Sequence, residues 1–241
     1  MDSQRRQGTG LCCATTPMPI FTSFLSYNHV RHQDAVVMGR RSRFDVLKTY
    51  LEARGSFTAE EFAFLRTKFI PLTLRRGEFL QRAGTVAKYT GFVAWGCARK
   101  YAIDATGKEH IVGFAPETWW VADGVSLTTG TPSQFFIDAI EDSDLLLIDP
   151  VSHEQLVDRV PGYASAYRKA LQRAAAARDG RIARALSASA RERYLEFLET
   201  YPSIVARVPQ RMLASYLGVS PETVSRIRKA LWQERGRLST V

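Results

Sequence analysis

Charged and hydroxyl side chains recur at helical spacing between residues 207 and 231, among apolar residues that share this spacing. Two runs of apolar residues three and four positions apart flank residues 217–219, which predicts two short amphipathic helices joined by a tight turn. Gly218 can adopt the positive φ that ends the first helix. Ser220 suits the N-cap of the second helix, and Pro221 suits its first position.

The second helix of this pair has an apolar face and a polar face. Val224, Ile227 and Leu231 recur at spacings of three and four and are expected to point inward. The opposite face carries the polar residues Glu222, Ser225, Arg226 and Lys229. Two helices joined by a three-residue turn, the second basic on its outer face, predict a helix-turn-helix that binds DNA. The alternative is a helical hairpin inside a larger α-helical domain.

The residues around this pair resemble a family of bacterial transcription factors. Glu-Thr-Val-Ser-Arg follows the N-cap, Tyr-Leu-Glu-Phe-Leu stands upstream, and Arg-Ile-Arg-Lys continues the second helix. Over Arg193–Leu231 this pattern is similar to the Crp/Fnr family (cyclic-AMP receptor and fumarate-nitrate regulator), and most of all to its Bacteroidetes-type branch. The cyclic-AMP receptor has an arginine directly before the glutamate, where this chain has Pro221. The resemblance therefore does not imply the same operator.

This resemblance implies which side chains contact DNA. In the family, the positions that match Glu222, Ser225 and Arg226 contact base edges. Arginine can bridge guanine O6 and N7, and glutamate can accept from a cytosine amino group, so the residue types suit this role. Other basic and hydroxyl residues are predicted to hold phosphates without reading sequence: Arg207, Arg211, Ser220, Thr223, Arg228 and Lys229.

The excess positive charge of the chain lies in its C-terminal third. The 241 residues carry a formal net charge of +9. Residues 1–160 hold 18 Lys and Arg against 18 Asp and Glu, whereas residues 161–241 hold 15 against 6. This asymmetry favours phosphate binding, because neutralising phosphates releases their counterions. A solvated basic surface is the alternative.

Cysteine content and hydropathy indicate a cytoplasmic protein. Cys12, Cys13 and Cys97 are too few for a disulfide framework, and too few for the iron–sulfur cluster that some family members hold on four cysteines. No apolar run approaches the ~20 residues of a membrane span. The start of the chain also lacks the apolar segment of a signal peptide.

Four regions are expected along the chain. Residues 1–40 lack sustained periodicity and are predicted to be a disordered extension; the alternatives are a true start at Met38 or an arm that binds a partner. Residues 41–150 are expected to form an effector domain of strands and flanking helices. Residues 151–186 are expected to hold a short helix and a long dimerisation helix. Residues 187–241 are expected to form the helix-turn-helix domain.

Between residues 71 and 150, short alternating runs are separated by glycines, which predicts antiparallel strands. The expected strands are 79–80, 92–95, 99–103, 110–114, 135–140 and 145–148. Asp104–Gly107 suits a hairpin loop, and a capping box at Thr58 opens one of two preceding helices. Short strands at about ten-residue spacing predict a small β-roll, and hence an α+β fold. Over residues 44–150 the segment resembles the family's cyclic-nucleotide-binding-type effector domain.

A short helix capped by Ser152 and a long helix over residues 161–186 are expected to follow the β-roll. Tyrosines and alanines of the long helix recur at the spacing of a coiled-coil seam: Tyr163, Tyr167, Ala170, Ala174 and Ala177. The resemblance makes this the dimerisation helix, and a two-fold dimer suits palindromic DNA. The alternative is a helix packed on its own β-roll. The helix-turn-helix is expected to be of the winged type, with a short wing after Leu231.

Nucleotide-binding members of the family hold a cyclic phosphate with a Gly-Glu pair and an Arg-Ser pair. In this chain Ala122 and Asp123 stand at the first pair, and Ser133 and Gln134 at the second. The arginine is missing, no nearby basic residue in the sequence replaces it, and a cyclic phosphate is expected to meet an uncompensated Asp123. Cyclic AMP is therefore not expected as an effector. Residues that could line a pocket for another effector are Glu117, Trp120, Asp123, Ser133 and Gln134. The alternative is that the tryptophans fill the core.

No pattern in the sequence indicates an enzyme or a metal site. The four histidines lie far apart, without metal-ligand spacing: His29, His32, His110 and His153. No nucleophile motif, phosphate-binding loop or carboxylate pair occurs. The sequence predicts a homodimeric transcription regulator without a cofactor, with DNA and RNA polymerase as partners and no membrane association. The alternatives are a regulator gated by a small effector, and a sensor or interaction protein without DNA binding.

Overall fold

The computed structural model describes residues 41–238, and the chain from Ser42 onward forms one compact unit. The helices are α1 (Arg43–Glu52), α2 (Ala59–Arg66), α3 (Gly124–Thr129), α4 (Pro150–Arg159), α5 (Pro161–Ser187), α6 (Ala190–Thr200), α7 (Gln210–Leu217) and α8 (Pro221–Leu238). The strands are β1 (Ile70–Leu74), β2 (Phe79–Gln81), β3 (Thr90–Trp95), β4 (Ala98–Ile103), β5 (Glu109–Ala115), β6 (Trp120–Val121), β7 (Phe136–Ala139) and β8 (Ser143–Ile148). Within residues 41–238, no helix has the length and apolar character that crossing a membrane requires.

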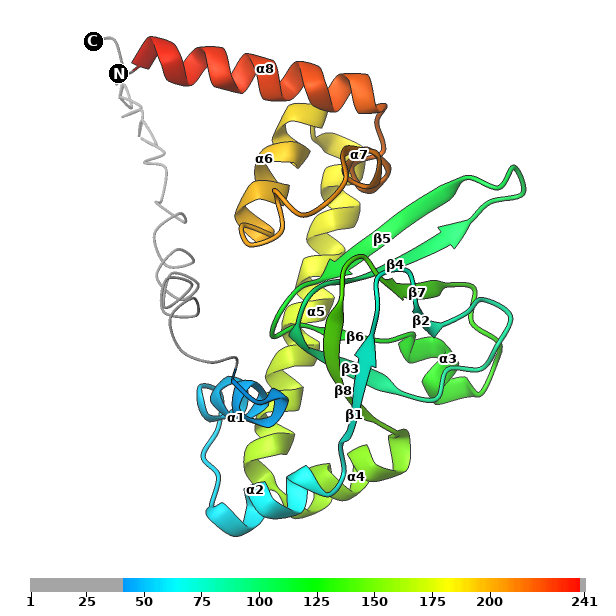
Figure 1. Ribbon diagram of the computed structural model, residues 1–241, viewed down its shortest axis with the longest axis vertical. Coiled ribbons are helices and arrows are strands. Elements are labelled where there is room, and N and C mark those ends of the chain that lie inside the picture. Colours follow the sequence, from blue (N-terminus) through cyan, green and yellow to red (C-terminus); the bar gives the residue numbers. More distant parts are fainter. Residues whose placement is uncertain (1–40, 239–241) are drawn as a thin grey trace, which may run out of the picture. The chain divides into compact units, whose positions relative to one another are not determined.

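The eight strands form two antiparallel four-stranded sheets, in the orders β1-β8-β3-β6 and β2-β7-β4-β5 (Figure 1). Apolar side chains from both sheets join in one buried cluster, which includes Val93, Ile137 and Leu145. The long helix α5 runs past the β-roll to the C-terminal helices. The observed fold is α+β with an antiparallel β-roll, as the spacing of the short runs predicts.

Each predicted strand overlaps an observed one, but the sequence did not indicate β1, β6 or α3. Pro71 within β1 argues against a strand, yet β1 lies at the edge of its sheet, where a missing N–H is tolerated. The hairpin loop forms as predicted, because Asp104 accepts hydrogen bonds from the amides of Thr106 (2.8 Å) and Lys108 (3.1 Å). Gly107 in this loop has φ +83°.

The predicted N-cap of α4 is wrong by three residues. Asp149, not Ser152, caps this helix, and its side chain accepts from the Ser152 amide at 2.9 Å. Pro150 then occupies the first helical position, where its missing N–H has no cost. The aspartate and proline together outweigh the weaker signal of the serine.

Helices α1, α2, α4 and the start of α5 pack against strands β3 and β8. Their shared cluster of buried residues includes Leu47, Leu51, Leu65, Phe92, Leu146, Leu156, Tyr163 and Ala166. Tyr163 is only 2% exposed, and its hydroxyl lies 2.8 Å from Nδ1 of His153 on α4. The first residue of the predicted seam therefore belongs to the interior of its own chain.

Helices α6, α7 and α8 share a buried apolar cluster with the β-roll. The β-roll contributes Cys97, Tyr101, Ile111, Phe114 and Ile140. The helices contribute Tyr194, Phe197, Leu213, Leu217, Val224 and Ile227, among others, and the segment between α6 and α7 contributes Tyr201 and Ile204. In the described residues no strand follows β8, and α8 continues to Leu238 where a wing was expected. The winged part of the prediction is therefore wrong for this part of the chain.

Two glycines of α5 differ in the space around them, which gives a matched test of the packing. A β-carbon on Gly162 would lie 2.1 Å from the carbonyl oxygen of Ser56, whereas one on Gly180 would meet nothing within 4 Å. We expect Gly162→Ala to lower the free energy of unfolding by about 1–3 kcal/mol. Gly180→Ala should raise it by about 0.5–1 kcal/mol, because alanine favours a helix interior. Urea unfolding of both variants checks this, and equal effects would contradict the packing of α5 against the segment between α1 and α2.

Candidate nucleic-acid interface

Helices α7 and α8 form the expected helix-turn-helix. Gly218 ends α7 with φ +67°, and its amide donates to Ser215 O at 3.2 Å. Ser220 caps α8, since its hydroxyl oxygen accepts from the Thr223 amide at 3.3 Å. Leu213 and Val224 are fully buried between the helices. The turn and the inward face thus lie where the apolar spacing predicts.

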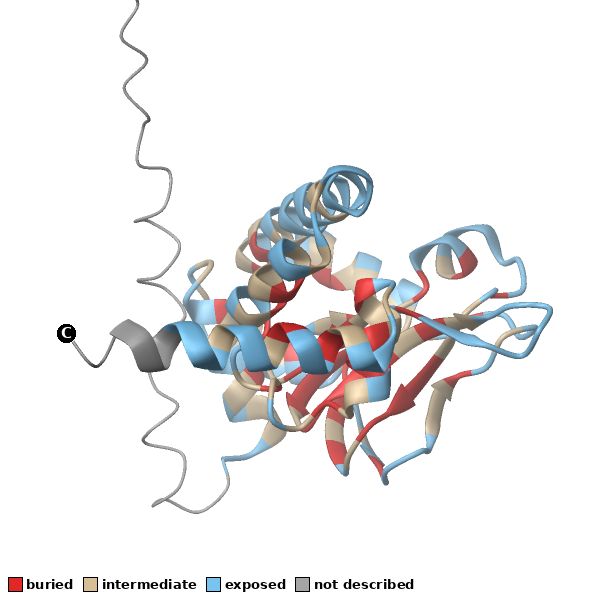
Figure 2. Cartoon of the chain, turned by 90° about the horizontal axis from the view of Figure 1, so that it is seen from above, coloured by how far each residue is buried: buried red, intermediate tan, exposed pale blue. Residues whose placement is uncertain are grey.

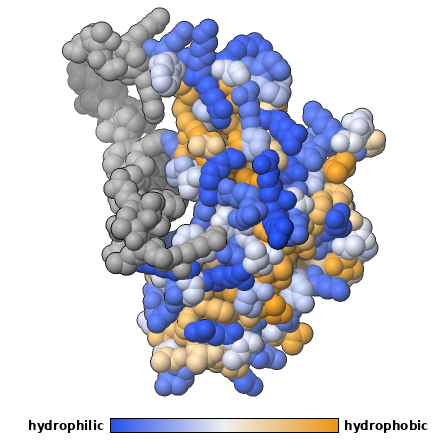
Figure 3. Space-filling view, viewed as in Figure 1, coloured by the Kyte–Doolittle hydropathy of each residue, from blue (hydrophilic) through white to orange (hydrophobic). Residues whose placement is uncertain are grey.

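The three predicted base-reading residues of α8 are exposed: Glu222, Ser225 and Arg226. Figure 2, which views the chain from above, shows that much of α8 is exposed. The amide of Glu222 and the hydroxyl of Ser220 lower the pKa of the Glu222 carboxyl, and Arg226 adds to this. Glu222 is therefore an ionised hydrogen-bond acceptor at neutral pH. The surface over α8 is mostly hydrophilic (Figure 3).

Gln210 at the start of α7 is a site residue that the sequence patterns did not indicate. Its Nε2 donates to Ser225 Oγ at 2.8 Å and to Pro221 O at 2.7 Å. This contact fixes the beginning of α8 against α7. Because Ser225 accepts this bond, its own hydroxyl hydrogen remains available to another acceptor.

The predicted phosphate-binding residues fall into two groups. Arg211, Ser220 and Lys229 are exposed, and Thr223 is half-buried beside Ser220. Arg228 instead turns inward, and its Nε donates to the Tyr194 hydroxyl at 3.1 Å. Arg228 therefore links α8 to α6.

Arg207 is half-buried and is also engaged within the chain. Its two terminal nitrogens lie 2.8 Å from both carboxylate oxygens of Glu117, and one lies 2.8 Å from Glu141. Burial opposes ionisation of Glu117, but the bonds and charge of Arg207 outweigh it and hold its pKa below the ordinary value. Burial raises the pKa of Glu141. With its guanidinium held by two carboxylates, Arg207 is not placed to contact a phosphate in this structure.

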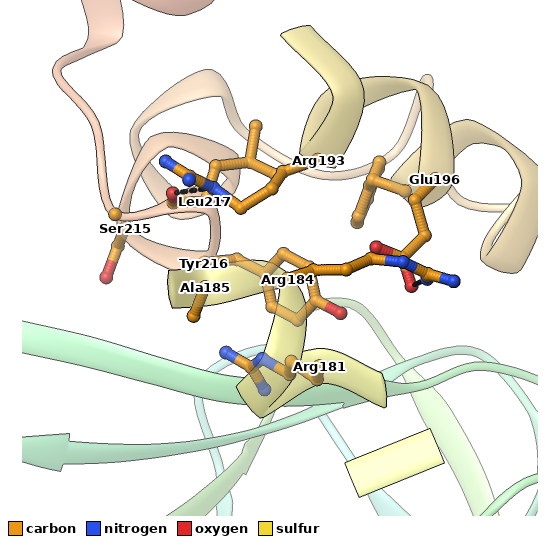
Figure 4. A pocket seen from close by; sticks show the side chains of 10 residues that line it. Arg181, Arg184, Ala185, Arg193, Glu196, Ser215, Tyr216 and Leu217 are labelled. Carbon is orange, nitrogen blue, oxygen red and sulfur yellow. Dashed lines mark hydrogen bonds and ion pairs between the residues drawn. The ribbon is translucent and has the colours of Figure 1, made fainter. Parts of the chain in front are cut away.

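A cleft of about 230 Å³ lies where α5, α6 and α7 meet, and three arginines line it (Figure 4). Arg193 donates to Leu217 O (3.1 Å) and Ala188 O (2.6 Å), at the C-terminal ends of α7 and α5. Arg184 pairs with Glu196 across the same joint. Cations at helix C-termini are stabilising. The arginines of this cleft therefore have a structural role in holding α5, α6 and α7 together, and this role needs no bound ligand.

The structure brings together two of the predicted effector residues. Ser133 donates to Asp123 at 2.6 Å, and both side chains are buried. Lys100 on β4 lies 3.5 Å from the Asp123 carboxylate. Burial opposes the charges of Asp123 and Lys100; nonetheless Ser133 and Lys100 hold the pKa of Asp123 below its ordinary value. The expectation of an uncompensated Asp123 is therefore wrong, because β4 supplies a cation from a distant part of the sequence.

The other three predicted effector residues lie elsewhere. Glu117 pairs with Arg207, and Gln134 is exposed. Trp120 packs in an aromatic cluster, with ring centroids 5.0 Å from Phe92 and 6.3 Å from Tyr50. The five residues do not converge on one pocket, and Trp120 has the core-filling role that was the alternative.

The histidines of the described region have partners within the chain. His110 Nε2 lies 2.7 Å from the Asp104 carboxylate in the β4–β5 hairpin. His153 contacts Tyr163 and Tyr167 between α4 and α5. Within residues 41–238, no three His, Cys, Asp or Glu side chains gather in a way that could hold a metal ion.

Beyond its first turns, α5 exposes a stripe of large apolar side chains. These are Tyr167, Leu171, Ile182 and Leu186, which are 39%, 52%, 57% and 86% exposed. Ala174 and Ala177 are also exposed, whereas Ala170 is half-buried. Tyr167 belongs to both the predicted seam and the exposed stripe. Tyr163 is interior, and the other stripe residues lie on the face of α5 next to the predicted seam.

Solved structures, but no family model and no curated protein, resemble this chain. No protein-family model matches the sequence, and no curated protein matches it. Among solved structures, the c-di-GMP responsive global regulator CLP of Xanthomonas campestris is 16% identical, with a TM-score of 0.59 over 73% of this chain and 93% of CLP. A CooA mutant from Carboxydothermus hydrogenoformans is 19% identical, with a TM-score of 0.57 over 71% and 79% of the two chains. FixK2 from Bradyrhizobium japonicum is 21% identical, with a TM-score of 0.55 over 69% and 85%.

CLP is a global regulator of gene expression. A further structure, from Eubacterium rectale, is assigned to the Crp/Fnr family of transcriptional regulators and is 16% identical, with a TM-score of 0.55 over 74% and 85% of the two chains. The chain therefore has the fold of that class of regulator, with a cyclic-nucleotide-binding-like β-roll, a long helix and a C-terminal helix-turn-helix. At these identities the comparison establishes the fold, and the Bacteroidetes-type branch remains a prediction from the sequence.

Proposed function

We propose that this chain is a transcription regulator that binds DNA sequence-specifically as a homodimer on palindromic operators. The observation that carries the proposal is the outer face of α8. Glu222, Ser225 and Arg226 are all exposed there, on a helix fixed by Gln210 and by a buried core. Base reading in a major groove requires a helix that is held in place and that exposes polar or charged side chains.

Within this proposal, the side chains of α7 and α8 divide into two roles. Arg226 bridges guanine O6 and N7, Glu222 accepts from cytosine, and Ser225 donates its hydroxyl hydrogen. Arg211, Ser220, Thr223 and Lys229 hold phosphates and so set the register without reading sequence. The C-terminal excess of 15 Lys and Arg over 6 Asp and Glu supports the phosphate contacts.

The exposed stripe of α5 supports the homodimer. Leu171, Ile182 and Leu186 lie on one face at helical spacing, each more than half exposed. Apolar rows of this kind mark association surfaces. Pairing α5 with its copy would cover the row, and two-fold symmetry would give each half of a palindrome one α8. A cytoplasmic location and contact with RNA polymerase belong to the same proposal.

The proposed regulator is not controlled by cyclic AMP. Asp123 is buried and already holds Ser133 and Lys100, so a cyclic phosphate would compete with a fixed carboxylate. A second candidate is a regulator gated by another small effector, and Lys100 favours it because this lysine brings a cation to the site. The third candidate, an interaction protein without DNA binding, predicts a weak and salt-insensitive response to DNA.

The division between base and phosphate contacts can be tested on an operator selected from randomised duplexes. Arg226→Ala should cost about 1–3 kcal/mol on the selected sequence and relax preference at one base pair. Lys229→Ala should weaken binding to all sequences alike and reduce the salt slope by about one. Fluorescence anisotropy across a salt series measures both. Equal losses on selected and random DNA for Arg226→Ala would contradict the base-reading role.

Self-association through α5 can be tested with one substituted stripe residue and a matched control. Leu171→Asp should weaken the dimer by about 3 kcal/mol, roughly 100-fold, because each half would bury an unpaired carboxylate. Ala176→Asp adds the same charge at another exposed position of α5, which lies about 140° around the helix from Leu171 and about 80° or more from every residue of the stripe. Sedimentation velocity should show dissociation of the first variant only. Two equally dissociated variants, or two intact dimers, would rule out this face.

Cyclic AMP should leave the DNA affinity of the wild-type chain unchanged, because Ser133 stands where nucleotide-binding members of the family have the arginine of the Arg-Ser pair. Anisotropy with and without the nucleotide checks this, and Lys100→Met is the matched variant. DNA binding that requires cyclic AMP in the wild type and is lost in Lys100→Met would show that Lys100 has taken the place of the arginine.

A further inference from the structure

Arg207 lies in the segment between α6 and α7 and reaches into the β-roll. It contacts Glu117, in the loop after β5, and Glu141, in the loop after β7, at 2.8 Å each. We call these three residues the carboxylate clasp. Among the described residues, Thr118 beside Glu117 is the single non-glycine residue with positive φ, at 68°. Backbone strain of this kind is retained where the surrounding contacts require it.

A second contact joins the helix-turn-helix to the β-roll at β5, the edge strand of its sheet. The Ile111 amide donates to Ser215 Oγ at 3.0 Å, and the same hydroxyl donates to Glu109 O at 2.7 Å. Arg181 of α5 donates to Ile111 O at 3.1 Å. The exposed hydrogen-bonding groups at this end of β5 are thus satisfied by α7 and α5, which holds α7 at a defined place on the strand.

We propose that Arg207 is a positioning residue: the carboxylate clasp keeps the helix-turn-helix docked on β5 and so fixes the orientation of α8 relative to the β-roll. The consequence for operator binding rests on the function proposed above. Docking leaves Glu222, Ser225 and Arg226 exposed, so the docked state is compatible with an approaching duplex.

The charges of the clasp favour this role over a phosphate contact. Two carboxylates face one guanidinium, and Gly96 donates a further amide hydrogen bond to Glu117 at 3.2 Å. Moving Arg207 to a phosphate would leave two half-buried carboxylates without their cation, next to the buried Cys97. Arg207 Nε is buried and has no hydrogen-bond partner among the described residues, a cost that a freely solvated arginine would not bear.

Amide exchange of Ile111 in the full chain reports docking directly, without DNA. Its N–H is held by Ser215 of α7, whereas other amides of β5 pair with β4. In Arg207→Gln, and in Glu117→Gln, exchange of the Ile111 amide measured by NMR should accelerate about tenfold through local undocking. The β4-paired amides should keep their rates, which separates undocking from general loss of stability.

The matched control is Arg211→Gln, the same chemical change at an exposed arginine of α7 that makes no clasp contact. It should leave Ile111 exchange unchanged. Unchanged exchange of Ile111 in both Arg207→Gln and Glu117→Gln would overturn the clasp, and so would acceleration of every β5 amide alike.

DNA titrations then separate positioning from phosphate contact. If Arg207 is a positioning residue, it acts together with Glu117. Arg207→Gln and Glu117→Gln should then both weaken binding to the selected operator and leave the salt slope unchanged. As a phosphate contact, Arg207→Gln would reduce the slope by about one, and Glu117→Gln would tighten binding by releasing the arginine. The second pattern would overturn the proposal. If no duplex is bound at all, the proposed function fails, and the exchange of Ile111 still decides the clasp.

Discussion

Aromatic side chains of the β-roll and of the C-terminal helices pack in one continuous cluster, and the placement of the helix-turn-helix depends on it. The Phe114 ring on β5 lies 6.0 Å from Phe197, 6.0 Å from Tyr201 and 5.6 Å from Tyr216. Trp119 also contacts Tyr201, at 5.1 Å. Large aromatic groups dominate the burial energy of such contacts. The helix-turn-helix thus takes its orientation from the β-roll as well as from the helix that leads into it.

Arginines of the chain fall into two groups that differ in burial: those that bond groups of the protein and those that face solvent. Arg193 and Arg207 are half-buried and bind carbonyl or carboxylate groups of neighbouring segments. Arg99, with an 8% exposed side chain, pairs with Asp138 at 2.7 Å inside the β-roll. Arg226 and Arg211 remain exposed. A guanidinium that is largely removed from water donates most of its hydrogen bonds within the protein, whereas an exposed one can exchange water for phosphate or base.

The β-roll resembles an effector domain in fold, but its polar centre is satisfied from within. Asp123, Ser133 and Lys100 form a small hydrogen-bonded group, in which the positive charge of Lys100 compensates the negative charge of Asp123. The Lys100 ammonium also lies 4.1 Å from the Phe135 ring. A fully connected polar group of this kind stabilises a single arrangement. An effector for this site must either engage Lys100 or displace its bond to Asp123.

The sequence by itself determined the helix-turn-helix, the long helix, six strands of the β-roll and the outward placement of Glu222, Ser225 and Arg226. Each of these follows from local spacing, caps and turn residues, which act over a few positions. The tertiary structure decided what Arg207, Arg228 and Tyr163 contact, which cation reaches Asp123, and which face of α5 is exposed. Their partners come from other elements of the fold: Arg207 is 90 residues from Glu117, and Lys100 is 23 residues from Asp123. Spacing encodes which face of its own element a side chain occupies, but only folding determines which other element that face meets.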